Sequence, residues 1–345
     1  MTGRKNEKNS IGVLPDTEIR ALCDAGVISS AGGLEKDQIQ PASIDLRLGT
    51  KAYRMRASFL PGLGKDVSDF FNDDLVMHEL DLTQGAVLET GCVYLVPLKE
   101  VLNLPEGLSG AANPKSSTGR IDVFVRMIAN GSDRFDAARA GYEGPLYVEI
   151  SPRTFSILAR EGDRLLQLRL RNGPQNTVRD EIFSIDLKPG DDDIAGYRAK
   201  RHSRVLDLKN VNGHMIDDFW EPVRPYNGAL VLDPGEFYIL ASKEKVVIPV
   251  DEAAEMAPIA PEFGEFRAHY AGFFDPGFGV DGIEGKAVLE VRSREVPFIL
   301  TDGQPMGRLV FEPMTMAPKV PYGAAGSFSN YQGQGLKLSK HFEGK

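Results

Sequence analysis

Short apolar runs recur along this chain, and turn residues separate them. Most runs are about four to seven residues long and rich in Val, Ile, Leu, Phe and Tyr. The separators are turn signals, among them Thr90-Gly91, Gly162-Asp163, Asp233-Pro234-Gly235 and Asp302-Gly303. Short strands at regular spacing, with few helical stretches, are typical of antiparallel folds that close on themselves and so protect their edge strands. The pattern predicts an all-β protein of the jelly-roll or closed-barrel kind.

One segment has the period of a helix instead. Between Asp16 and Ala25, the side chains of Ile19, Leu22 and Cys23 fall on one face of a helical turn. Asp16 is a residue type that commonly caps a helix N-terminus. We therefore expect a short amphipathic helix that begins just after Asp16.

The chain also repeats itself. The stretch GAVLETGCVYLVPLKEVLNLP at 85–105 is echoed by GALVLDPGEFYILASKEKVVIP at 228–249, with most positions 144 apart, as Tyr94 and Tyr238 are. Shorter landmarks keep the same order: SIDL at 43–46 and 184–187, Tyr-Arg at 53–54 and 197–198, and GPLYVEI at 144–150 against GKAVLEV at 285–291. A repeat of this kind indicates a duplicated unit. We expect a flexible tail over 1–10, a first barrel over 11–175 and a second barrel over 176–345.

Composition and charge restrict the possible partners. The 345 residues are enough for two domains of ordinary size, and 42% hydrophobic with 26% charged residues is typical of a soluble globular protein. A formal net charge of -9 argues against a broad electrostatic grip on nucleic acid. No stretch approaches the roughly 20 apolar residues of a membrane span. We expect a cytoplasmic protein with no nucleic-acid or membrane partner.

The cysteines and histidines are too scattered to predict a metal site. Cys23 and Cys92 lie far apart and lack partners at metal-ligand spacing. The five histidines show no His-x-Glu or Cys-x-x-Cys grouping, which zinc-dependent nucleobase deaminases require. We expect no zinc and two reduced thiols.

The segment NPKSSTGR at 113–120 follows a predicted strand and combines hydroxyls with cations. Ser116 and Ser117 can donate to phosphate oxygens, and Arg120 offers a planar fork of donors that Lys115 cannot reproduce. This composition suits a polyphosphate, although a polar turn with flanking charges would have it too. The segment is not a Walker loop, because Gly-x-x-x-x-Gly-Lys is absent.

The segment AGFFDPGFGVDGIEGKAVLEV at 271–291 is a glycine-rich hairpin that runs into a strand. Glu290 stands there between Leu289 and Val291. Such a carboxylate is either a surface position of an alternating strand or a base whose pKa is raised in a pocket. The equivalent position of the first copy is also a glutamate, Glu149, which makes it the alternative base.

The C-terminal stretch PYGAAGSFSNYQGQGLKLSKHF is rich in Gly, Ser, Tyr and Gln. It is either disordered or a lid that folds over a bound nucleotide. In the second case Tyr322, Tyr331 and Gln334 would stack on the nucleotide or bond to it.

At these segments the chain resembles the dCTP deaminase family, which shares its trimeric barrel fold with dUTPases. QPASIDLRLG at 40–49 looks like the family's opening strand, KSSTGR its phosphate loop, AGFFDPGF its base-recognition hairpin, VLE at 288–290 its catalytic strand and SNYQGQ at 329–334 its closing tail. The resemblance implies two tandem dUTPase-like distorted jelly-roll barrels and hydrolytic deamination of dCTP to dUTP and ammonia. It also implies a homo-oligomer, a trimer or another multiple of barrels, with sites shared between barrels.

The resemblance assigns roles position by position. Glu290 would be the general base, and Glu149 is the alternative. The only expected metal is Mg²⁺, bound through the triphosphate. The implied nucleotide-binding residues are Lys115, Ser116, Ser117 and Arg120 for the phosphates and the catalytic water, Ala271, Asp275 and Val288 for the base and deoxyribose, and Tyr322 and Gln334 for the triphosphate. The chain departs from the family at Lys115, where arginine is usual, and at Asn330, where lysine is common.

The two copies are degenerate in complementary ways. The second has APIAPEFGEFR where a phosphate loop should be, and the first has SDRFDAARAGYEG where Asp-Pro-Gly should be. A working site therefore either joins the 115–120 loop of a first copy to Asp275 and Glu290 of a second, or pairs like copies and uses Glu149. Two other functions stay open: a dUTP pyrophosphatase, alone or coupled to deamination with Asp275 near the α-phosphate, and a nucleotide sensor without catalysis.

Overall fold

The computed structural model describes residues 11–72, 74–188, 193–260, 266–269 (backbone only), 272–280, 282–293, 295–327 and 330–343. Over these residues the chain consists of short strands with three α-helices and one 3-10 turn, which confirms the all-β prediction. The helical elements are α1 (Asp16–Asp24), η1 (Val67–Phe70), α2 (Ser116–Gly119) and α3 (Ile216–Phe219). The expected tail over 1–10 lies outside the described residues. None of the described helices is both long enough and apolar enough to cross a membrane.

The first half of the chain builds two main sheets. One has the order β11 (Ala137–Ala138), β9 (Leu108–Pro114), β14 (Leu166–Asn172), β4 (Ser43–Leu46) and β3 (Ile39–Gln40), with β1 (Gly12–Val13) paired to β14. The other has the order β10 (Val123–Ala129), β12 (Glu143–Pro152), β8 (Val93–Asn103), β5 (Lys51–Met55) and β6 (Val76–Asp81), with β2 (Ile28–Ser30) paired to β8. A small sheet joins β7 (Ala86–Leu88) and β13 (Ile157–Ala159) to β17 (Leu206–Asp207).

The second half builds a corresponding set. One sheet has the order β15 (Arg179–Ser184), β26 (Pro305–Pro313), β21 (Glu252–Pro258) and β23 (Phe273–Phe274). The next has the order β18 (Trp220–Val223), β16 (Gly196–Ala199), β20 (Tyr238–Val246), β24 (Gly285–Ser293) and β22 (Phe266–His269). The last pairs β19 (Ala229–Leu232) with β25 (Phe298–Thr301).

Most strands of the second half have a counterpart in the first, in the same order, although β1, β2 and β3 have none among the described residues. The five-strand path β10-β12-β8-β5-β6 matches β22-β24-β20-β16-β18, and the pair β7 with β13 matches β19 with β25. Equivalent tyrosines even make the same bond, since the hydroxyl of Tyr94 accepts from the N–H of Glu89 and that of Tyr238 from Asp233, each at 3.0 Å. The sequence repeat predicts a duplicated unit, and two copies of one unit should have matching strand orders. The position of the boundary near 175 stays a prediction.

The predicted turns are confirmed by their glycines. Gly91, Gly162, Gly235 and Gly303 all adopt a positive φ, between 72° and 84°. Glycine reaches this left-handed region without the steric penalty that other residues incur. The strand boundaries could therefore be predicted from local sequence.

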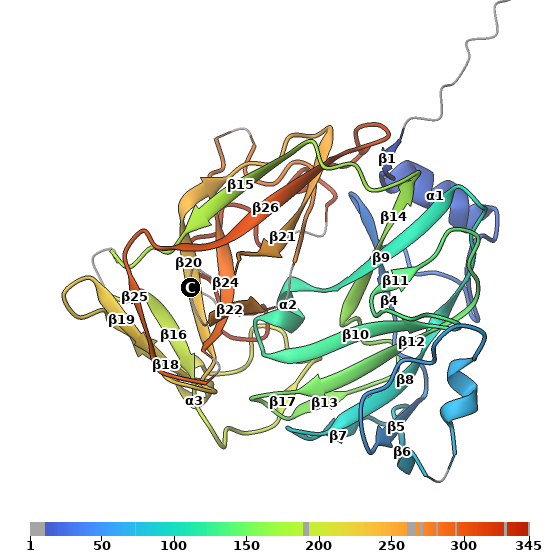
Figure 1. Ribbon diagram of the computed structural model, residues 1–345, viewed down its shortest axis with the longest axis horizontal. Helices are drawn as coiled ribbons and strands as arrows, with labels where there is room; N and C mark the ends of the chain where they lie inside the picture. Colours follow the sequence, from blue (N-terminus) through green and yellow to red (C-terminus); the bar gives the residue numbers. More distant parts are fainter. Residues whose placement is uncertain are drawn as a thin grey trace, which may run out of the picture.

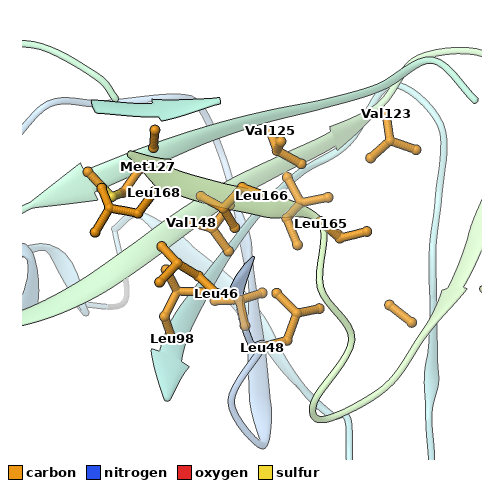
Figure 2. Packing of buried hydrophobic residues seen from close by; sticks show 14 of the residues in the cluster. Leu46, Leu48, Leu98, Val123, Val125, Met127, Val148, Leu165, Leu166 and Leu168 are labelled. Atoms are coloured by element: carbon orange, nitrogen blue, oxygen red, sulfur yellow. The ribbon is translucent and has the colours of Figure 1, made fainter. Parts of the chain in front are cut away.

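The hydrophobic core of the first half lies between its two main sheets. Alternate residues of each strand point inward, as the two-residue period of a strand requires. Figure 2 shows these side chains meeting between the sheets: Val125, Met127 and Val148 from β10 and β12, and Leu46, Leu166 and Leu168 from β4 and β14. A second core, around Leu240, Leu289 and Phe311, fills the other half.

The two halves pack directly against each other (Figure 1), with α2 lying between the strands of the first half and those of the second. Second-half aromatic residues belong to the first core, and the fully buried Trp220 has its ring 5.3 Å from that of Phe155. Strand β17 pairs in parallel with β13 of the first half. Buried ion pairs, such as Arg171 with Glu312 at 2.6 Å, also cross the boundary. A cavity at this boundary can therefore be lined by residues of both halves.

The predicted helix exists, but its cap was predicted wrongly. Ile19 is fully buried, and Leu22 and Cys23 pack against the core, as expected. Asp16, however, is the first helical residue, and Pro15 is the N-cap. The Asp16 carboxylate accepts from the N–H of its neighbour Thr17 and also from the backbone N–H groups of Lys319 and Val320, so a tertiary contact is added to the local bond.

Candidate active site

The predicted phosphate loop forms a tight turn at the boundary between the halves. Strand β9 ends at Pro114, Lys115 stays extended, and α2 begins at Ser116. The N–H groups of Thr118 and Gly119 both bond to the carbonyl of Lys115, which closes the turn. In such a turn the first N–H groups, those of Ser116 and Ser117, have no partner within the helix. Hydroxyls and amides of adjacent serines are thus grouped at one place.

Strand β24 presents two faces with different surroundings. Ala287, Leu289 and Val291 point into the second core, whereas Val288 packs with the residues of the first core. Because neighbouring residues of a strand alternate, Glu290 lies on the same face as Val288 and points toward the first half. Of the two predictions for Glu290, the surface position is wrong, because the side chain is only 4% exposed.

These elements line one cavity of about 100 Å³. The residues that surround it come from both halves of the same chain: Gln40, Pro114, Lys115, Ser116, Ser117, Gly119, Arg120, Gln167, Met256, Gly272, Phe273, Phe274, Asp275, Phe278, Val288, Glu290, Tyr322, Asn330, Tyr331 and Gln334. The structure thus brings the 115–120 loop of the first copy together with Asp275 and Glu290 of the second. Residues of one chain thus bring together the two parts that the sequence separates between its copies.

Glu290 is a perturbed carboxyl group in this cavity. Burial, which penalises the charged form, raises the pKa of Glu290 to about 8, and the nearby Arg120 guanidinium opposes this only in part. A carboxyl group with a pKa near neutrality can both accept and donate a proton under ordinary conditions.

Arg120 is held from three sides by the C-terminal tail. Its guanidinium donates to the side-chain oxygen of Gln334 at 2.8 Å and to the carbonyl of Lys337 at 3.0 Å. It also lies over the ring of Tyr331, 3.9 Å from the centroid, in a cation–π contact. Its buried Nε has no hydrogen-bond acceptor among the described residues. One buried donor of this cation is therefore left unpaired among the described residues.

The Asp-Pro-Gly turn places a second buried carboxyl group. Gly277 has a φ of +97°, and a Cβ there would lie 2.8 Å from Pro321 and 2.9 Å from the backbone of Tyr322, so only glycine fits. Burial raises the pKa of Asp275 to about 6, although Arg169 lies 3.7 Å away. The Oδ1 atom of Asp275 has no hydrogen-bond partner within the described part of the chain.

The described residues of the C-terminal tail fold against the cavity rather than away from the protein, and closure of the tail over a bound nucleotide stays a prediction. The hydroxyl of Tyr322 accepts from the N–H of Tyr331 at 3.1 Å, and burial raises the pKa of Tyr322. The side chain of Gln334 also donates to the carbonyl of Lys286 at the start of β24. Ser339 donates to the carbonyl of Ser117 at 2.8 Å. The tail thus connects the phosphate loop to the strand that carries Glu290.

A second, polar cavity of about 450 Å³ adjoins the first and shares four lining residues with it. The shared residues are Gln40, Lys115, Ser117 and Asn330. Lys115, Arg164 and Lys340 contribute positive charge to this cavity. Lys115 pairs with the buried Asp45, and Arg164 with Asp37, so part of that charge is already neutralised.

Glu149, the alternative base, does not line the cavity. It is as buried as Glu290, at 4% exposure, and burial likewise raises its pKa. Its surroundings differ, because residues 56–72, which follow β5, fold back over this face of their own sheet. Ser58 bonds to the Glu149 carboxylate, and Phe71 lies 6.1 Å from the ring of Tyr147, two residues before Glu149.

The equivalent segment of the second half follows a different course. Residues 200–219, between β16 and β18, cross to the first half, where β17 pairs with β13 and Phe219 packs against Phe155 at 5.4 Å. The sheet face that carries Glu290 is therefore free to pack against α2. The sheet face that carries Glu149 is covered by the segment that follows β5. Because of this contrast, Glu290 lines the cavity and Glu149 does not.

The predicted site residues other than Glu149 and Ala271 all line the cavity. Ala271 lies outside the described residues. Sequence reasoning missed Gln40, Gln167 and the Arg169 that accompanies Asp275. A signal existed for two of them, because in β14 the polar Gln167 and Arg169 alternate with the leucines of the core, and an arginine at such a position is seldom buried without a partner.

Two family models match this chain. A family model described as the N-terminal domain of 2'-deoxycytidine 5'-triphosphate deaminase matches residues 10–174, and the C-terminal domain of the same family matches residues 159–342. The second match alone covers more than half of the chain. This chain belongs to the dCTP deaminase family. The resemblance seen in the sequence is confirmed.

A solved structure and curated relatives carry the same family name. A crystal structure of 2'-deoxycytidine 5'-triphosphate deaminase from Agrobacterium tumefaciens is 51% identical, covers 90% of this chain and 99% of its own, and has a TM-score of 0.85. A "dCTP deaminase, dUMP-forming" of Methanosphaera stadtmanae is 31% identical over 46% of this chain and 78% of its own length. The protein of that name from Methanothermobacter thermautotrophicus is 29% identical over 44% of this chain and 74% of its own. The product in the names of these relatives is dUMP, whereas dUTP was expected above.

Proposed function

We propose that this dCTP deaminase family member hydrolyses the C4 amino group of the cytosine in dCTP, with Glu290 as the proton-transfer group. The observation that carries the proposal is the position of a fully buried carboxyl group, with a pKa raised to about 8, in a cavity that also holds Arg120 and the two serines of α2. A perturbed carboxyl beside cations and hydroxyls in a closed pocket is typical of proton-transfer catalysis.

The two adjoining cavities suggest where the parts of the nucleotide bind. The first, at about 100 Å³, is smaller than the roughly 300–1,000 Å³ of most small-molecule sites. We place the cytosine ring there, against Val288 and Glu290, with Asp275 beside the deoxyribose. The triphosphate would then run past Ser116 and Ser117 toward the larger cavity that contains Lys115. Tyr322 and Gln334 would contact it from the tail, which must open for the nucleotide to enter.

The reaction balances without a metal at the base. The Glu290 carboxylate takes a proton from water while the oxygen attacks C4, and that proton is delivered to N3 of the ring. Glu290 then takes the second proton of the former water and passes it to the amino group as the C4–N bond breaks, which leaves a C4 carbonyl and ammonia. Arg120 and the serine hydroxyls orient the water and stabilise charge near C4.

We expect kcat/KM for dCTP to increase with pH up to about 8 and then to level off. The physical reason is that only the ionised form of Glu290 accepts a proton from water, and burial holds the pKa of that group near 8. A pH–rate profile between about pH 6 and about pH 9 measures this directly. A profile that is flat across that range would contradict the assignment of Glu290 as the base.

Mg²⁺ is proposed as a partner of the triphosphate, because magnesium usually keeps water and phosphate oxygens as ligands. Zinc is not expected to take part. The homo-oligomer implied by the resemblance stays a prediction, and the cavity described above is lined by residues from both halves of one chain.

The test of the proposed function is a product analysis of the purified full chain with dCTP and Mg²⁺. We expect ammonia and dUTP in equal amounts, at a rate that a zinc chelator leaves unchanged. Tight dCTP binding without ammonia under any metal condition would instead indicate a nucleotide sensor. Loss of activity with a zinc chelator would contradict the metal-free chemistry at the base.

A second candidate is a coupled reaction that continues from dUTP to dUMP and pyrophosphate. Two observations favour it. The names of the two relatives above give dUMP as the product. The buried Oδ1 of Asp275 has no hydrogen-bond partner among the described residues and could direct a water to the α-phosphate. Pyrophosphate and dUMP from either dCTP or dUTP would support the coupled reaction, whereas stable dUTP would exclude it.

A further inference from the structure

A buried ion pair connects the two halves beside the cavity. A guanidinium nitrogen of Arg292, in β24, contacts Oδ2 of Asp122, in the turn after α2. The same nitrogen lies 3.2 Å from the hydroxyl of Thr154, which donates to the same Asp122 oxygen. The Asp122 side chain is 1% exposed and that of Arg292 is 15% exposed, so the pair is largely removed from solvent. Such a pair is sensitive to the loss of either partner.

Both residues stand two positions beyond a group of the cavity. Asp122 follows Arg120, and Arg292 follows Glu290 on the same face of β24, because alternate residues of a strand share a face. Arg292 also donates to the carbonyl of Gly235, so its guanidinium is fixed to the second half. The ion pair therefore links the segment that carries Arg120 to the strand that carries Glu290.

The backbone around Asp122 is equally fixed. Its φ is +54°, which aspartate tolerates better than most residues. Its N–H donates to the carbonyl of Gly119 at 2.9 Å, and its own carbonyl accepts from the N–H of Arg153 at 2.9 Å. Movement of the Asp122 side chain would therefore be transmitted to the short turn between Gly119 and Asp122, which includes Arg120.

We propose that Asp122 and Arg292 are positioning residues, which hold Arg120 in register with Glu290 across the boundary between the halves. The proposal rests on the proposed function and adds two residues that do not line the cavity. Catalysis by oriented groups depends on such alignment, and a displacement of about 1 Å can lower a rate roughly 100-fold. The Asp122 carboxylate has a second effect, because its negative charge contributes to the raised pKa of Glu290.

Three variants of the full chain test the proposal: Asp122→Asn, Arg292→Gln and the double variant. We expect each single change to lower kcat roughly 10- to 100-fold with a smaller change in KM. The double variant should lose little more than the worse single variant, because both changes break one interaction. In Asp122→Asn the rise of kcat/KM with pH should move to lower pH, since a negative charge near Glu290 is lost, whereas Arg292→Gln keeps that charge and should show no such downward shift. A fourth variant, Arg292→Lys, keeps the positive charge and should have a higher kcat than Arg292→Gln.

The matched control is Arg160→Gln. Arg160 makes a bidentate pair with Asp207 across the same boundary, at 2.5 and 3.0 Å, and its side chain is 17% exposed, close to the value for Arg292. Neither residue lines the first cavity. Wild-type kcat in this control, with a fall in Arg292→Gln, separates positioning from general loosening of the two halves. Equal losses in both variants, or additive losses in the double variant, would overturn the proposal.

A measurement that does not depend on turnover tests the link between Asp122 and Glu290 separately from the proposed deamination. Titration of the Glu290 carboxyl by ¹³C NMR should show a lower pKa in Asp122→Asn than in the wild type. If the wild type shows this coupling but releases no ammonia, the proposed function fails and the coupling stands. If kcat falls in neither single variant and the titration does not move, the positioning role is wrong.

Discussion

Replacing Glu290 by glutamine is expected to lower kcat for dCTP deamination by roughly 100- to 10,000-fold, the usual contribution of a general acid–base group. Glutamine keeps the size of the side chain and removes its proton-accepting carboxylate. Binding of dCTP should change little, because the phosphate contacts proposed above come from α2 and the tail. Steady-state kinetics, with binding measured by calorimetry, checks both statements.

Glu149→Gln is the matched control, because Glu149 has the same exposure and the equivalent place in the first-half sheet. Its carboxylate bonds to Ser58 under the segment 56–72 rather than facing the cavity. We expect kcat to stay within about twofold of the wild type, since surroundings remote from the chemistry contribute little to the barrier. A large loss in Glu149→Gln together with full activity in Glu290→Gln would reverse the assignment.

The same Glu290→Gln variant should be more stable than the wild type at alkaline pH. The folded-state pKa of Glu290, about 8, lies above the ordinary value of 4.5, so the folded chain binds this proton more tightly than the unfolded chain. Stability from this group is therefore present below about pH 4.5 and is lost as the pH rises through about 8. Glutamine does not titrate, so the difference in Tm should grow across that window and then stay constant.

Replacing Arg120 by lysine is the second change with a large expected effect. Lysine keeps the charge but loses the planar fork that reaches Gln334 and Lys337 and lies over Tyr331. We expect kcat/KM to fall roughly 100- to 1,000-fold, comparable to the loss of one oriented donor in other active sites. Kinetics with dCTP measures the loss, and limited proteolysis of the C-terminal tail should show faster cleavage.

The control for Arg120 is Arg126→Lys. Arg126 also combines an ion pair, with Asp136 at 2.6 Å, and a cation–π contact, with Phe135 at 4.6 Å, but it lies away from the cavity. Arg126→Lys should likewise weaken an ion pair and a cation–π contact, at a more exposed position, without the loss of activity. Similar kinetics in the two lysine variants would mean that Arg120 acts only through stability.

The strands and turns could be predicted from the sequence because their signals are local. Apolar alternation and glycines that require a positive φ, such as Gly162 and Gly303, are properties of a few neighbouring residues. The Asp16 cap failed for the opposite reason, since its carboxylate is used by Lys319 and Val320, about 300 positions away in sequence. Local propensity has no information about such a contact.

The candidate site could be predicted residue by residue but not as an arrangement. Glu149 and Glu290 have equivalent places in equivalent strands, so the sequence alone could not choose between them. The choice is made by the connections that follow β5 and β16, one of which covers its own sheet while the other crosses to the other half. Which way a long connection folds depends on the packing of both halves, and therefore on the whole chain.

The central claim is that Arg120 and Glu290 of one chain form one site. A complementation experiment with the two impaired variants tests this claim most directly. Glu290→Gln and Arg120→Lys chains would be produced together with different tags, and any species that carries both tags would be isolated and assayed with dCTP. We expect no more activity than the separate variants show, because every chain contains one defective site. Recovery of a substantial fraction of wild-type activity would show that sites form between chains, as in shared-site oligomers, and would contradict the account.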